Sequence, residues 1–248
     1  MSKKIAEGIK GLVLDIKFGN GAFLEKEEKG IELAKKMINI GKKYNIKTTA
    51  FLTNMNQPLG YYIGNSLEIL ESIEVLKNKG PNDIMELIKE LGAEMIYMSN
   101  EKKTDLKKNK DEIEKVIANG KALEKFKELI KEQDGDTEII ENIEKLKSKT
   151  TIQIKSDKEG FINEINSKLL GTTIRDLGGG RNKTTEKIKH LIGIQLFKKM
   201  NEKIKKNEPI CELYLEKNKK KEIEKAIENI KKAFKIEEKE NKEIFTLI

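Results

Sequence analysis

The chain has 248 residues, of which 37% are hydrophobic and 37% charged, and its net charge is +8. This length accommodates one large domain or two small ones with a sizeable core. No apolar run approaches the roughly 20 residues of a membrane span, and the start SKKIAEGIK lacks the apolar stretch of a secretory signal. Because Cys211 is the single cysteine, no intrachain disulfide can form, and we expect a reducing, cytoplasmic setting.

The positive charge does not by itself indicate nucleic-acid binding. Only Arg175 and Arg181 among the 50 basic residues are arginine, the side chain best suited to bidentate phosphate and guanine contacts. The lysines alternate with glutamates, which is typical of solvated helix faces. Aromatic residues make up 5% of the chain and tryptophan is absent, so a base-stacking platform is poorly supplied. We therefore expect neither a nucleic-acid nor a membrane partner.

The first 55 residues have the pattern of a βαβ unit. Residues 10–18 form a near-continuous apolar run, typical of a parallel strand covered on both faces. Residues 26–42 carry apolar side chains at helical spacing, and Gly41 stands near the expected helix end. Residues 46–53 predict a second strand. This order predicts two parallel strands joined by a crossover helix.

The remainder of the chain divides into a helical part and a part of mixed structure. Four further helices are predicted at residues 65–78, 82–97, 105–118 and 121–132. From about residue 150, short alternating segments (TIQIKSD, GFINEI, ICELYLE) predict strands, and residues 219–234 predict an amphipathic helix. The predicted fold is α/β, with part of a mostly parallel sheet flanked by helices in residues 1–149 and a smaller α+β domain in residues 150–248.

Two glycine-rich stretches are candidates for ligand contact. The GNGAF stretch at residues 19–23 lies between a strand and a helix, where backbone N–H groups can reach a ligand. It lacks both the dinucleotide-binding spacing and the Gly-Lys-Ser/Thr ending of a P-loop, so a plain tight turn is the favoured interpretation. The GGGR stretch at residues 178–181 could hold an anion with Arg181 as counter-charge, but a flexible turn between two β segments is favoured.

The remaining reactive side chains do not form a catalytic pattern. His190 lies in the apolar run KHLIGIQLF without a partner at catalytic or metal-binding spacing, which favours a packed or half-buried histidine. Cys211 alternates within a predicted strand and is expected in the core. No cluster has zinc-ligand spacing. Composition and spacing therefore predict an α/β chain with a candidate cleft at residues 17–23 and name no reaction.

The order of several longer stretches carries a family resemblance. The sequence contains SKKIAEGIKGLVLDIKFGNGAF, KTTAFLTNMNQPLGYYIGNSLEILESIE, KGPNDIMELIKELGAEM, NGKALEKFKELIKEQDGD and LGGGRNK, in this order. Together they resemble the pyrimidine-nucleoside phosphorylase family, which includes thymidine phosphorylase, over essentially the whole chain. The resemblance implies a pentosyltransferase in which phosphate attacks C1′ of a pyrimidine nucleoside, releasing the free base and a pentose 1-phosphate.

The resemblance also implies that family members are substantially longer and that this chain corresponds to their C-terminal three-fifths. We expect the family's N-terminal helices, through which its members form homodimers, and its phosphate-binding segments to fall outside the chain. A truncated or split enzyme, inactive without a complementary N-terminal polypeptide, is the expected consequence. The alternative is a non-catalytic remnant or an interaction partner of a full-length phosphorylase. The related phosphoribosyltransferase chemistry fits less well, because its diphosphate loop is not present.

Site residues follow from the resemblance position by position. Lys3 corresponds to the family's base-binding lysine, whose ammonium would stabilise the departing base, although a lysine at a chain end is ordinarily frayed. Phe23 corresponds to a residue that lines the base pocket, and core packing is its other interpretation. The family also binds potassium, and the ligands implied here are the carbonyls of Leu59 and Tyr62 and the carboxylate of Glu71. The family usually has a small residue at the position of Tyr62.

Overall fold

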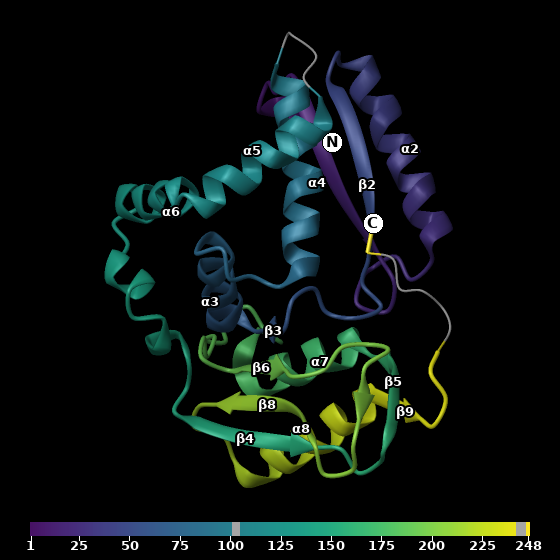
Figure 1. The fold of residues 1–248 in the computed structure, drawn as a ribbon, viewed down its shortest axis with the longest axis vertical. Helices are drawn as coiled ribbons and strands as arrows, with labels where there is room; N and C mark the ends of the chain where they lie inside the picture. Colours follow the sequence, from purple (N-terminus) through teal and green to yellow (C-terminus); the bar gives the residue numbers. More distant parts are fainter. Residues whose placement is uncertain (101–104, 242–246) are drawn as a thin grey trace.

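The computed structural model describes residues 1–100, 105–241 and 247–248. Across these ranges no helix is both long and apolar enough to cross a membrane. The chain forms an α/β part followed by a part with antiparallel sheets, which occupy the upper and lower halves of Figure 1. The predicted α/β fold class is therefore confirmed, whereas the domain division at residues 149 and 150 remains a prediction.

The predicted βαβ unit is present. A short helix, α1 (Ser2–Ala6), precedes strand β1 (Gly11–Phe18), helix α2 (Glu27–Lys43) and strand β2 (Lys47–Asn54). The two strands are parallel along their whole length. Helix α2 packs on one face of the pair, and α4 (Asn82–Ser99) packs on the other (Figure 1).

This sheet is less covered than the sequence predicts. Within the described residues, β1 pairs with β2 alone, so the parallel sheet has two strands. The apolar run predicts strands buried on both faces, but only Ile16 on β1 and Thr53 on β2 are buried. Two strands bury too little surface for full cover, and no strand of the described part of the chain pairs with the other edge of β1.

All four helices predicted after the βαβ unit are confirmed. They are α3 (Asn65–Leu76), α4, α5 (Leu106–Ala118) and α6 (Lys121–Glu132). Two 3-10 turns, η1 (Thr137–Ile140) and η2 (Ile143–Leu146), bring the chain to the second half. The short strand β3 (Tyr62–Ile63) precedes α3 and pairs with a strand of the second half, so the two halves share a sheet.

The second half contains two antiparallel sheets. One has the order β3-β6-β8-β4 and the other β7-β5-β9. Strands β4, β5 and β8 and helix α8 were predicted, whereas α7, a π-helical turn η3 and strands β6, β7 and β9 were not. The bounds are β4 (Thr150–Lys155), β5 (Gly160–Ile165), α7 (Ser167–Ile174), η3 (Arg175–Gly179), β6 (Gly193–Leu196), β7 (Lys203–Ile204), β8 (Pro209–Leu215), α8 (Lys220–Ala233) and β9 (Phe234–Glu237).

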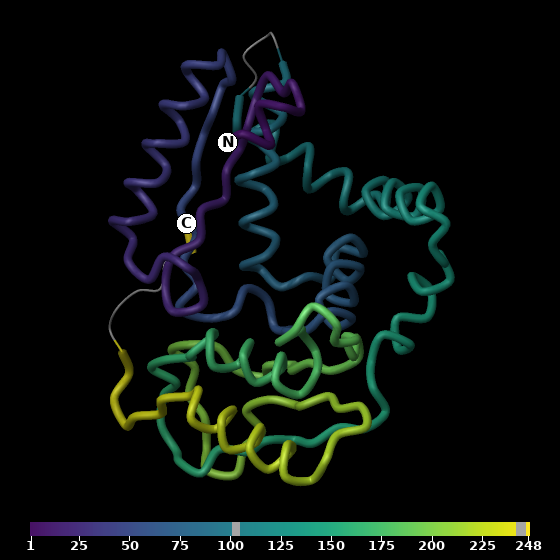
Figure 2. Tube along the Cα trace, turned by 180° about the vertical axis from the view of Figure 1, so that it is seen from behind, coloured from purple at the N-terminus to yellow at the C-terminus, as the bar shows by residue number. Residues whose placement is uncertain are grey.

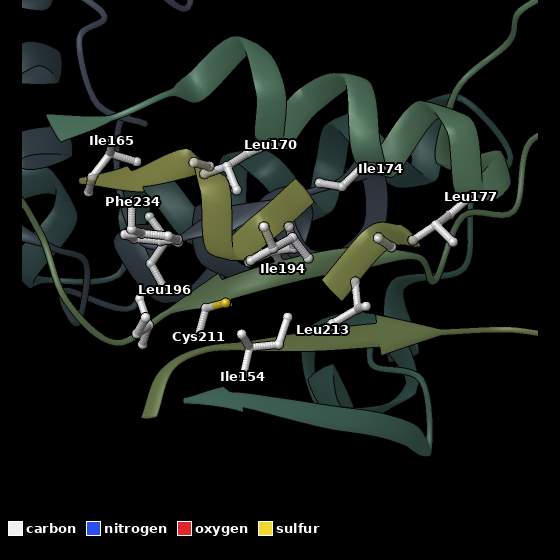
Figure 3. Close-up of a cluster of buried hydrophobic side chains, with 14 of the residues drawn as sticks. Ile154, Ile165, Leu170, Ile174, Leu177, Ile194, Leu196, Cys211, Leu213 and Phe234 are labelled. Atoms are coloured by element: carbon white, nitrogen blue, oxygen red, sulfur yellow. The ribbon is translucent and has the colours of Figure 1, made fainter. Parts of the chain in front are cut away.

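The largest hydrophobic core belongs to this second half. Figure 3 shows side chains of α7 pointing toward those of β6 and β8, with Cys211 among them. Ile194, Cys211 and Leu213 are fully buried, which confirms Cys211 as a core residue. The chain end returns to the first half, where the carbonyl of Leu247 accepts a hydrogen bond from the N–H of Asn54 (2.8 Å; Figure 2).

Candidate functional site

The glycine-rich turn after β1 uses its own backbone donors. The N–H groups of residues 19–22 donate, in order, to the carbonyl of Leu24, the Oδ1 of Asn56, the carbonyl of Met55 and the carbonyl of Gly19, at 2.9 to 3.0 Å. A cradle for an anion needs N–H groups that are free to point at the ligand. The favoured interpretation of this stretch as a tight turn is therefore confirmed.

Asn20 joins this turn to the second half of the chain. Its side-chain nitrogen, Nδ2, donates to the carbonyls of Asn56 (3.2 Å) and Ile165 (3.1 Å), and its side-chain oxygen, Oδ1, accepts from the N–H of Ser167 (2.8 Å). A Cβ on Gly21 would lie 2.8 Å from the Cβ of Ser167, so only glycine allows this close approach. The turn positions the second half against the carboxyl ends of β1 and β2.

The two residues predicted for the base pocket lie at opposite ends of β1. Lys3 is exposed in α1, before the strand, and Phe23 follows the strand. The strand between them, β1, has eight residues and therefore spans about 26 Å. Phe23 is fully exposed, so the alternative that it packs in the core is wrong. The structure does not bring Lys3 and Phe23 together.

The predicted potassium ligands lie around the loop at residues 57–62. Glu71 on α3 is buried, and its Oε1 accepts a hydrogen bond from the N–H of Tyr61 (2.7 Å). A Cβ on Gly60 would lie 2.3 Å from the Glu71 Oε2, so the carboxylate packs directly against the loop between Leu59 and Tyr62. Burial raises the pKa of Glu71 to about 7.

These residues fit a monovalent cation. The buried carboxylate of Glu71 is a hard-oxygen donor, and a bound cation would offset the cost of burying its charge. The ligand predicted at Tyr62 is its main-chain carbonyl, so the bulk of the side chain would not remove the donor. No group of three or more acidic, histidine or cysteine side chains that could hold a metal is present among the described residues.

A buried lysine beside this loop was not predicted from the sequence. The ammonium of Lys199 donates to the carbonyl of Pro58 and to Asp83 Oδ2 (3.2 Å), and it lies 5.1 Å from the centre of the Tyr61 ring. Burial lowers the pKa of Lys199, and the charge of Asp83 opposes that shift. Nothing in the pattern around Lys199 distinguishes it from the many exposed lysines of the chain.

The other candidates from the sequence, the GGGR stretch, His190 and Cys211, lie outside this site. The GGGR stretch begins inside the π-helical turn η3, which follows α7, and not after a β segment, so its predicted position between two β segments is wrong. Arg181 donates to the carbonyl of Glu186 (3.1 Å). His190 is exposed rather than packed, because the strand of its apolar run, β6, begins three residues later. Burial raises the pKa of the Cys211 thiol to about 12, as expected for an unreactive core cysteine.

Two cavities lie at opposite ends of the parallel sheet. One of about 930 Å³ is at the amino end of β1, with Met95 and Met98 among its lining residues. The other, of about 630 Å³, is lined by Asn20 and Asn56 from the first half and by Asn163 and Met200 from the second. Ligands of open α/β sheets bind at the carboxyl ends of the strands, where the second cavity lies.

Comparison with known proteins identifies the family. Residues 1–123 match the model of the glycosyl transferase family a/b domain, and residues 161–237 match that of the pyrimidine nucleoside phosphorylase C-terminal domain. The whole chain is 41% identical to the pyrimidine-nucleoside phosphorylase of Bacillus subtilis (strain 168). The chain belongs to the pyrimidine-nucleoside phosphorylase family.

Other family members have similar identity over most of the chain. The pyrimidine-nucleoside phosphorylases of Geobacillus stearothermophilus and Staphylococcus aureus (strain USA300) are each 39% identical over 215 residues, which is 86% of this chain. The matches cover 57% of the Bacillus subtilis protein and 49% of each of the other two. The chain thus spans about half the length of these relatives, and it corresponds to their C-terminal portion.

Proposed function

We propose that this chain forms the C-terminal portion of an enzyme that cleaves pyrimidine nucleosides, such as thymidine and uridine, with inorganic phosphate. Phosphate attacks C1′, the glycosidic bond breaks, and the base leaves with the bonding electrons. The products are the free base and a pentose 1-phosphate. The observation that carries the proposal is the 41% identity to a pyrimidine-nucleoside phosphorylase over the whole chain.

The edge of β1 that does not pair with β2 supports a cleft to which further residues, outside this chain's matched part, also contribute. This edge and the half-buried side chains of β1 would be covered by further residues of an α/β sheet. The matched relatives are longer than this chain, and the phosphate-binding segments implied by the family fall in their unmatched part. We therefore expect phosphorolysis to need residues equivalent to that part.

Lys3 and Phe23 would act on the base. The ammonium of Lys3 would donate to a pyrimidine carbonyl and stabilise the negative charge that the base gathers as it leaves. The ring of Phe23 would give apolar contact to the flat base. Since the two lie at opposite ends of β1, a shared pocket requires α1 to move. Helix α1 contains no buried residue, so its repacking costs little.

Potassium would be held by Glu71 and the carbonyls of Leu59 and Tyr62. The bound ion would supply a fixed positive charge that orders the loop at residues 57–62. That loop connects β2 to β3, and hence connects the two halves of the chain. An ordered loop would then hold the two halves in a fixed relative position around the cleft.

Phosphate-dependent release of uracil and thymine from their nucleosides, measured by liquid chromatography, tests the proposal. The chain is assayed with potassium, first alone and then with a polypeptide equivalent to the unmatched part of the Bacillus subtilis relative. We expect activity in the mixture, with kcat lowered about 10²- to 10³-fold by Lys3→Ala. Lys4→Ala is the matched control, because Lys4 pairs with the exposed Glu7 (2.9 Å) and should leave the rate unchanged.

A mixture without activity would overturn the phosphorylase proposal. It would favour the other candidate function, an interaction partner of a full-length phosphorylase, which the open edge of β1 and the exposed Phe23 also suit. Co-purification of the inactive chain with a full-length relative would then be the decisive measurement. Activity of the chain without any second polypeptide would refute the assignment of phosphate binding to the unmatched part.

A further inference from the structure

Lys199 connects the two halves of the chain through buried polar contacts. It lies between β6 and β7 of the second half, and 8% of its surface is exposed. Its partners, the Pro58 carbonyl and the Asp83 carboxylate, belong to the first half and are 141 and 116 residues away in the sequence. The next residue, Met200, donates its N–H to the Oε1 of Gln57 (3.0 Å).

The loop that Lys199 contacts is held by two carboxylates. The N–H of Gly60 donates to Asp83 Oδ2 (3.0 Å), and the N–H of Tyr61 donates to Glu71 Oε1 (2.7 Å). Two acidic groups therefore hold two consecutive positions of the loop, and the Lys199 ammonium bonds directly to one of these groups, Asp83. The same ammonium lies over the ring of Tyr61, an arrangement that a cation favours electrostatically.

The charges at this site need a cation. Glu71 and Asp83 are both acidic, and Glu71 is 4% exposed. Buried charges are costly unless they are paired. The positive charge of Lys199 acts on both carboxylates, since it opposes the burial that raises the pKa of Glu71 and forms an ion pair with Asp83. The ammonium thus provides the kind of charge that a bound monovalent ion would provide.

We propose that Lys199 is a positioning residue for the loop at residues 57–62, and that its tethered ammonium competes with a monovalent cation for the charge of Glu71 and Asp83. The part concerning the cation rests on the proposed function, because the loop carries the carbonyls assigned to potassium. Lys199 keeps the loop ordered when no ion is bound. Its removal creates a site at which an ion from solution becomes necessary for stability.

Thermal unfolding of the full chain in potassium, sodium or choline chloride at equal ionic strength tests this proposal. We expect Lys199→Met to lower the melting temperature in choline by about 10 °C, because a buried carboxylate loses its counter-charge. Potassium at about 100 mM should restore at least half of that loss. The rise in melting temperature should be several-fold smaller for the wild-type chain, in which Lys199 already supplies a positive charge. Lys198→Met is the matched control, because Lys198 forms ion pairs with Glu208 (3.1 Å) and Glu202 (3.9 Å) away from the loop.

An equal response of the wild-type and Lys199→Met chains to potassium would overturn the proposal, as would a destabilised variant that potassium does not restore. If Lys199→Met does not fold, the double variant Lys199→Met/Asp83→Asn tests the proposal instead. Removing one negative charge should recover folding, because the carboxylate that lost its counter-charge is then neutral. A double variant that also fails to fold contradicts the charge argument. These melts involve no nucleoside, so their failure is separate from a failure of the phosphorolysis assay.

Discussion

Replacing Asn20 with alanine tests how strongly the turn after β1 holds the two halves together. The substitution removes three side-chain hydrogen bonds, to the carbonyls of Asn56 and Ile165 and from the N–H of Ser167. Each such bond contributes about 1 kcal/mol net, so the free energy of unfolding should fall by about 3 kcal/mol. Asn20 lines a cavity of about 630 Å³. Water in this cavity can hydrogen-bond to the backbone groups that lose their partner, so the loss of stability should stay near 3 kcal/mol.

Urea denaturation followed by circular dichroism measures this change. The matched control is Asn163→Ala, which lines the same cavity but hydrogen-bonds to Glu237 and Lys239 within the second half. Asn163 also accepts a hydrogen bond from the N–H of Asn241. Its bonds to Glu237 and Lys239 are exposed to solvent and should contribute about 0.5 kcal/mol each, so we expect Asn163→Ala to cost about 2 kcal/mol in total. A loss for Asn20→Ala no larger than that of the control would refute the reasoning, because the contacts between the halves would then contribute little.

Three further predictions concern buried groups. Burial raises the pKa of Glu71 from 4.5 to about 7, so between pH 4.5 and pH 7 the folded state retains a proton that the unfolded state loses. The free energy of unfolding should therefore fall by about 3 kcal/mol as the pH rises from 4.5 to 7 in potassium-free buffer. Urea titrations at several pH values should show this fall for the wild-type chain and not for Glu71→Gln. Cys211 should react with a thiol reagent at pH 8 about 1000-fold more slowly in the native state than after unfolding, because burial raises its pKa to about 12. Leu213→Ala should destabilise the chain by about 2–5 kcal/mol, and equal destabilisation by the exposed Leu129→Ala would contradict this.

Local patterns predicted most of the helices and strands. The helical spacing around residues 26–42 and the apolar run at residues 10–18 each specify one element, because hydrophobic period and capping act over a few residues. The short strands β6 and β7 were missed, since four and two residues are too few to establish an alternating pattern. The prediction for His190 was wrong for a related reason, because its apolar run begins as a loop and becomes a strand only at Gly193.

The candidate site was predictable only in part. The family resemblance identified Glu71 and the loop beside it, and the structure shows that carboxylate buried against Gly60. Lys199 was not identifiable, because a buried lysine has the same local sequence features as an exposed one. Its role depends on Pro58 and Asp83, which are more than a hundred residues away.

The sequence alone determined the βαβ unit and the four helices that follow it, the core position of Cys211 and the family to which the chain belongs. These depend on residue periodicity and on residue identities in order, which are properties of the chain itself. Only the tertiary structure decided that Asn20 joins the two halves, that Phe23 is exposed and that Lys199 lies between Pro58 and Asp83. Such features depend on how distant segments approach one another, and no local pattern encodes that approach.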